Sequence, residues 1–99
     1  MIKVEVTNNR ISFLGHANYN DYGQDIVCAA ISATMMTSVE AIAKFDIDAI
    51  TIIESNDKVE LIQNKHDNIT NKLINNMLDL LKELEKKYPK NIKIINKEE

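Results

Sequence analysis

The apolar residues of this chain change their spacing several times, and this changing period constrains its fold more than any other feature. Ile2, Val4 and Val6 alternate with polar residues, as in a β-strand with one buried face. From Ile69 to Tyr88 the apolar residues recur at steps of three and four, which is the period of an amphipathic helix. Strands and helices that share one core predict a mixed α and β fold.

The other segments extend this pattern into a regular order of elements. Asn8–Asn9 suits a tight hairpin turn, and Pro89 ends the second helix. We predict one domain spanning residues 1–99, of class α+β and order ββα–ββα–β, with a mostly antiparallel sheet and both helices packed on one face. The predicted strands are Met1–Thr7, Arg10–Leu14, Asp48–Glu54, Val59–Ile62 and 92–95, and the predicted helices are Ile26–Lys44 and Ile69–Tyr88.

The first predicted helix is unusual because its run from Ile26 to Lys44 is rich in alanine and apolar almost all round. Such a helix is expected to be buried on most sides, at the centre of the domain or against a second subunit. Asp25 precedes the run and is a preferred N-cap residue.

Charge and composition exclude several classes of function. The formal net charge is −3, which argues against a nucleic-acid binder because such proteins usually carry a clustered basic face. The single cysteine rules out an intramolecular disulfide. We expect no signal peptide, because the N-terminus alternates apolar and polar residues like a strand. We also expect no membrane contact, because no apolar run approaches the roughly 18 residues of a membrane span. These features indicate a cytoplasmic protein.

Cys28 is the best candidate for a chemically active residue. The predicted helix start places it in the first turn, where unbonded N–H groups and the helix dipole lower the pKa of a thiol. The same N–H groups could stabilise an oxyanion. From position alone, a single cysteine in an apolar, alanine-rich helix is more often a small core residue.

His16 is the candidate base for this nucleophile, although from position alone a loop histidine without a catalytic role is the more common case. It opens a predicted loop, 16–24, and can meet Cys28 only if that loop folds back beside the helix start. Asp25 is either only the helix cap or also the residue that orients His16. Ser32 lies one turn after Cys28 and could support the site, although a bond to its own helix is the more common role.

The remaining loop and metal candidates are less specific. Tyr19 and Tyr22 could be lid residues or ordinary surface aromatics, and Gly23 could supply a hinge. We predict no metal and no cofactor, because Cys28, His16 and His66 lack the paired spacing of a metal site.

Several residue types stand at fixed spacing around the candidate pair: Gly15-His16-Ala17, Gly23, Asp25-Ile26-Val27-Cys28-Ala29-Ala30 and Ser32-Ala33. This motif resembles that of the ribosomal-processing cysteine protease family, called Prp. The resemblance implies a cysteine endopeptidase with a Cys28–His16 dyad, which removes a short N-terminal leader from a large-subunit ribosomal protein. It further implies a homodimer and a mobile loop over the site, whose Ala17, Tyr19, Tyr22 and Gly23 would contact the leader peptide. Many members have Gly and Glu where this loop has Asn20 and Asp21.

Two other functions compete with proteolysis. A non-catalytic ribosome-assembly factor could hold a peptide by strand addition and would not need the thiol. A thiol redox or acyl-transfer enzyme would need an external thiol for disulfide chemistry, because the chain has no second cysteine. We therefore rank the redox function lower.

Overall fold

Seven elements make up the computed structural model, which describes residues 1–15 and 22–97. They follow the order predicted from the apolar periods, and most of their bounds agree with the prediction to within two residues. The elements are β1 (Ile2–Val6), β2 (Arg10–Leu14), α1 (Tyr22–Phe45), β3 (Ile50–Ser55), β4 (Lys58–Gln63), α2 (Asn68–Lys87) and β5 (Ile92–Asn96).

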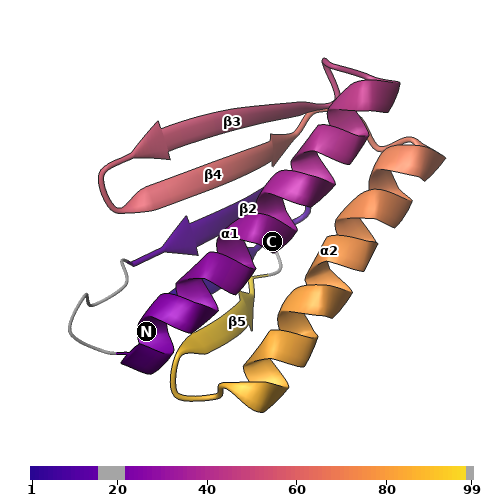
Figure 1. Ribbon diagram of the computed structural model, residues 1–99. Coiled ribbons are helices and arrows are strands. Elements are labelled where there is room, and N and C mark those ends of the chain that lie inside the picture. The colour runs from indigo at the N-terminus through magenta and orange to yellow at the C-terminus, as the bar shows by residue number, and fades with distance from the viewer. Residues whose placement is uncertain (16–21, 98–99) are drawn as a thin grey trace.

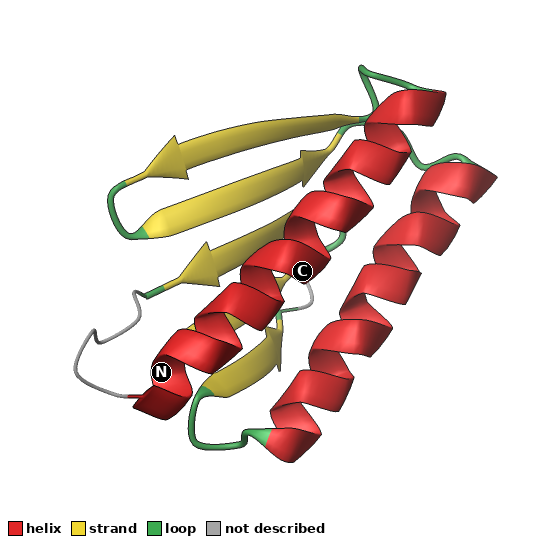
Figure 2. Ribbon diagram, in the orientation of Figure 1, coloured by secondary structure: helices red, strands yellow, loops and turns green. Residues whose placement is uncertain are grey.

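The five strands form one sheet in the order β3-β4-β2-β1-β5. Three of the four neighbouring pairs are antiparallel, and only β1 and β5 run parallel. Both helices cross the same face of this sheet, and α1 lies between β3 and α2 (Figures 1 and 2). The predicted class, with a mostly antiparallel sheet and helices on one face, is confirmed.

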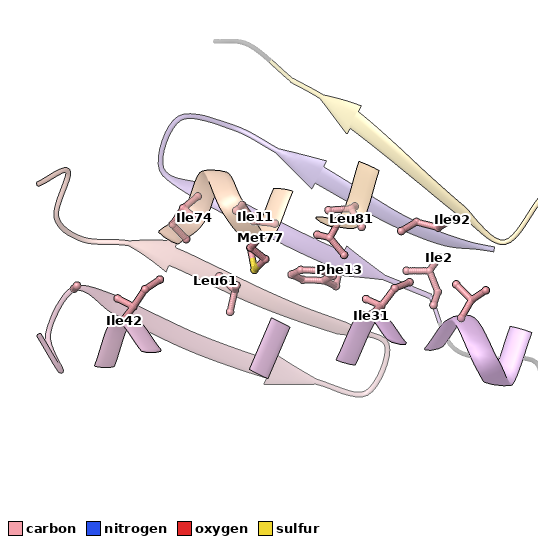
Figure 3. Close-up of a cluster of buried hydrophobic side chains, with 13 residues drawn as sticks. Ile2, Ile11, Phe13, Ile31, Ile42, Leu61, Ile74, Met77, Leu81 and Ile92 are labelled. Carbon is pink, nitrogen blue, oxygen red and sulfur yellow. The ribbon is translucent and has the colours of Figure 1, made fainter. Parts of the chain in front are cut away.

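The core lies between the helices and the covered face of the sheet. Val4, Met77 and Leu81 are fully buried there, although they come from the first strand and the second helix. Figure 3 shows Phe13 and Leu61 of the sheet and Ile31 of α1 in the same cluster. The alternating residues of the strands and one stripe of each helix meet in this layer, as their periods require.

Helix α1 departs from the prediction in its start and in its burial. It begins at Tyr22, four residues before the expected first helical residue Ile26, so Asp25 lies within the first turn and is not the N-cap. Val27, Ile31 and Ile42 are buried, yet Met36 on the outer side is 56% exposed. The helix thus packs along one stripe, and the expectation that it is buried on most sides is wrong for the single chain.

The expectation that no segment is long and apolar enough to span a membrane is wrong for helix α1. Residues Ile26–Phe45 pass that test by length and composition. The test alone is weak evidence, because the core helix of a globular protein also passes it. Here the helix lies across the sheet and contacts α2.

Candidate active site

A cavity of about 260 Å³ opens where α1, the end of β2 and the β3–β4 turn meet. Cys28 is half-buried and lines this cavity. Apolar side chains form much of the wall: Ile2, Phe13, Ile31, Met35 and Val59. The remaining lining residues, apart from Gly15 and Cys28, are polar or charged: Ser32, Ser55, Asn56, Asp57 and Lys58.

Cys28 lies further from the start of its helix than the sequence predicted. Because α1 begins at Tyr22, Cys28 is in the second turn and not in the first. The unbonded N–H groups of a helix belong to its first four residues, and the dipole effect falls off within the first turn. The helix start therefore stabilises a Cys28 thiolate less than the sequence predicted. A reactive thiolate would depend more on a neighbouring base.

Gly15 fixes the chain at the edge of the cavity. Its φ of 98° lies in the left-handed region that favours glycine. Its N–H donates a hydrogen bond to the carbonyl oxygen of Asp57 at 3.0 Å. A Cβ at this position would lie 2.9 Å from the carbonyl oxygen of Met1. The chain thus leaves β2 at a junction of three segments.

The other predicted site residues fall into two groups. Ser32 lines the cavity together with Cys28, as expected for residues one helical turn apart. Tyr22 and Gly23 belong to the first turn of α1 and not to the predicted loop. The remaining predictions lie outside the described residues: those for His16, Ala17 and Tyr19, the side chains of Tyr22 and Gly23, and the orienting role of the Asp25 side chain.

Sequence reasoning missed the contribution of the β3–β4 turn. The sequence predicts only a connection between two strands at residues 55–58, yet Ser55, Asn56 and Asp57 all line the cavity of Cys28. The sheet order explains this placement, because β4 pairs with β2 and brings Lys58 opposite Leu14. No local signal in the turn itself could have indicated that neighbourhood.

His66, the second histidine of the chain, lies at the opposite end of β2 from the cavity of Cys28. His66 is exposed, and its Nε2 lies 2.8 Å from Oδ1 of Asn9 at the other end of β2. Among the residues that the structure describes, no group of three His, Cys, Asp or Glu could hold a metal ion. His66 is therefore not part of the Cys28 cavity.

Comparison with known proteins places this site in a family. The family model described as "Cysteine protease Prp" matches residues 1–93. The chain belongs to this family. A curated relative, the ribosomal processing cysteine protease Prp of Mycoplasma genitalium, is 40% identical over 55 residues. That match covers 56% of this chain and 52% of the relative, so it spans about half of the relative's length.

Solved structures of Prp from Staphylococcus aureus resemble the whole fold. One, in complex with a substrate peptide, matches with a TM-score of 0.88 and 26% identity over 98% of this chain and 100% of that chain. Another, with a covalently linked product peptide, matches with a TM-score of 0.85, 27% identity and the same coverage. The S. aureus protein thus binds peptides on the fold that this chain shares.

Proposed function

We propose that this protein is a cysteine endopeptidase that removes the short N-terminal leader of a large-subunit ribosomal protein. The observation that carries the proposal is the placement of Cys28 in the wall of a cavity of about 260 Å³, in a chain of the cysteine protease Prp family. The S. aureus relative with a substrate peptide supports a peptide as the ligand of this fold.

In the proposed mechanism, the Cys28 thiolate attacks the scissile carbonyl and forms a tetrahedral oxyanion, which collapses to an acyl-enzyme. His16 protonates the leaving amine and then activates the water that releases the leader. Backbone N–H groups stabilise the oxyanion in both steps. Because Cys28 lies in the second turn of α1, an imidazolium at His16 is the main factor that stabilises its thiolate.

Cleavage of a synthetic peptide tests the proposal directly. The peptide covers the leader and the first residues of the mature ribosomal protein, and mass spectrometry identifies the products. We expect the wild type to cleave at one bond, and both Cys28→Ala and His16→Ala to lose nearly all activity. Ala30→Ser is the matched control in the same helix. Full cleavage by Cys28→Ala would contradict the mechanism, and binding without cleavage by the wild type would favour the non-catalytic alternative.

The proposed dependence of the thiolate on His16 has its own test, which needs no substrate. Iodoacetamide should alkylate Cys28 at pH 6–7 faster than it alkylates a free thiol, because the reaction needs the thiolate. His16→Ala should remove this advantage and restore the pH dependence of an ordinary cysteine. An unchanged rate in the variant would mean that His16 does not stabilise the thiolate.

We further propose that the protein is a homodimer that packs through the outer stripe of α1. Ile26 and Met36 are 45% and 56% exposed, and Ala29 and Ala33 lie between them at helical spacing. This stripe points away from the core, and apolar residues in such a row favour contact with another protein surface.

Sedimentation velocity tests the dimer. We expect a dimer for the wild type and a monomer for Met36→Glu, because a charge in the contact would lose its hydration. Lys72→Glu, on an exposed position of α2, is the control and should remain dimeric. A monomeric wild type at micromolar concentration would contradict this part of the proposal.

We also propose a cytoplasmic location, where ribosomal proteins are made. Fluorescence microscopy of a tagged chain would test it.

A further inference from the structure

The fold closes one edge of the sheet and leaves the other open. At the β5 edge, the N–H of Ile94 donates a hydrogen bond to the Glu85 carboxylate of α2 at 2.7 Å. At the opposite edge, β3 has no strand on its outer side in the described part of the chain. A side chain thus occupies one edge, whereas the other can accept an additional strand.

The hydrogen-bond pattern shows which backbone groups of β3 point outward. Asn64 N–H donates to Ala49 C=O at 2.8 Å, so these two residues form a hydrogen-bonded antiparallel pair. Bonded pairs recur at every second position of the register that joins β3 and β4. The residues between them direct their N–H and C=O groups away from β4: Ile50, Ile52 and Glu54.

The side chains of this edge are also incompletely covered. Ile52 pairs with the buried Leu61 and so lies on the face that the helices cover, yet it is 43% exposed. Ile53 lies on the opposite face and is 46% exposed. An added strand would cover apolar surface on both faces of β3.

The charges around this edge indicate the kind of strand that suits it. Residues 46–57 contain no Lys or Arg and four carboxylates: Asp46, Asp48, Glu54 and Asp57. Asp46 forms an ion pair with Lys65, and Glu54 lies on β3 itself. A basic peptide would gain favourable contacts here, whereas a second copy of β3 would bring like charges together.

The open edge leads to the cavity of Cys28. Ser55, the last residue of β3, and Asn56 after it both line that cavity. Strands lie about 4.8 Å apart, so an added strand would lie about 14 Å from β2, which about four extended residues can span. A peptide paired with β3 can therefore turn over the β3–β4 turn and reach the thiol.

We propose that the outer edge of β3 binds an extended, basic segment of the substrate as a sixth strand and so directs the scissile bond to Cys28. This inference rests on the proposed protease function. The edge acts before the chemical step, through main-chain hydrogen bonds at Ile50, Ile52 and Glu54. Its loss should therefore change substrate binding and leave kcat nearly unchanged.

Backbone methylation of the peptide tests the inference with the native protein. The leader-junction peptide is made with a single N-methyl group at each position in turn, outside the scissile bond. We expect methylation of every second residue in the paired segment to raise KM about three- to tenfold, because each loses one hydrogen bond. Cleavage that is insensitive to methylation, or sensitive without this alternation, would overturn the inference while leaving the protease function intact.

A pair of variants tests the same edge from the side of the protein. Ile52→Pro removes an outward N–H without removing a bond to β4, and Ile52→Ala is the matched control that removes only side-chain atoms. We expect a higher KM for the proline variant than for the alanine variant, with equal kcat, and urea unfolding confirms that both are folded. Equal KM values in folded variants would overturn the inference.

Binding measurements keep the test independent of catalysis. The Kd of a fluorescein-labelled peptide for the Cys28→Ala protein should rise about threefold or more when Glu54→Gln is added, and less so at high salt. Glu83→Gln, an exposed change on α2, is the control. If the wild type cleaves no peptide, the proposed function fails, but this Kd comparison still decides the role of the edge. The inference would be overturned if Glu54→Gln had no effect on the Kd and the Kd values of the N-methylated peptides did not alternate.

Discussion

At the scale of single residues, Gly15 is the position where the local conformation is most demanding. Its positive φ and the nearby carbonyl oxygen of Met1 leave no room for an L side chain. Its hydrogen bond to Asp57 ties the end of β2 to the β3–β4 turn. One glycine therefore holds together two walls of the Cys28 cavity.

Gly15→Ala should lower the free energy of unfolding by about 1–3 kcal/mol, because it adds backbone strain and a close contact. Urea unfolding followed by circular dichroism measures the loss. A D-alanine at position 15, introduced by ligating a 1–27 thioester to Cys28–99, accepts a positive φ and should lose less stability. Equal losses for the two isomers would show that the conformation of Gly15 is not the cause.

At the scale of elements, α2 has a well-defined start. Asp67 is the N-cap of this helix. Its carboxylate accepts hydrogen bonds from the Thr70 N–H at 2.8 Å and from the Thr70 hydroxyl at 3.1 Å. These bonds, the backbone one first, hold the pKa of Asp67 below 3.8.

Asp67→Ala should therefore lower the melting temperature at neutral pH, because it leaves first-turn N–H groups of α2 without a partner. Thermal unfolding followed by circular dichroism measures this change. Asp79→Ala, at an exposed position within the same helix, is the control and should melt close to the wild type. A wild-type melting temperature for Asp67→Ala would show that the cap contributes nothing to stability.

The carboxylates of Asp67 and Asp46 make the stability of the fold depend on pH. The hydrogen bond from Lys65 is the largest factor that lowers the pKa of Asp46. Because both folded pKa values lie below 3.8, the unfolded chain binds more protons near pH 4. The free energy of unfolding should thus fall as the pH drops below about 5 and continue to fall through the folded pKa values. Urea titrations across this range check it, and Asp67→Ala should show a shallower fall.

At the scale of the whole molecule, one apolar layer joins the sheet to both helices. Leu81 is fully buried in that layer, whereas its neighbour Leu80 is 47% exposed. Leu81→Ala should cost about 2–5 kcal/mol of unfolding free energy, because it leaves a cavity that the packed core cannot fill. Leu80→Ala should cost about 0.5 kcal/mol or less. Similar losses in urea unfolding would contradict the observed packing.

The sequence by itself determined the elements, their order and the α+β class, because the period of apolar residues depends only on which side chains share a face. It also singled out Cys28 and Ser32, which the structure places on one cavity. Only the tertiary structure decided the strand order, which brings Ser55–Lys58 beside Cys28. Local periods carry no information about which strands pair, since pairing depends on contacts between distant segments.

The same limit explains the errors in helix α1. Its start at Tyr22 could not be predicted from the sequence, because Gly23 and Asp25 are poor helix formers and tertiary context can override such local preferences. Its composition also could not show that one side stays exposed, because the number of neighbours depends on how the helix crosses the sheet. Sequence therefore determined what each segment is, whereas the packing of distant segments decided which residues surround the thiol and which edge of the sheet stays open.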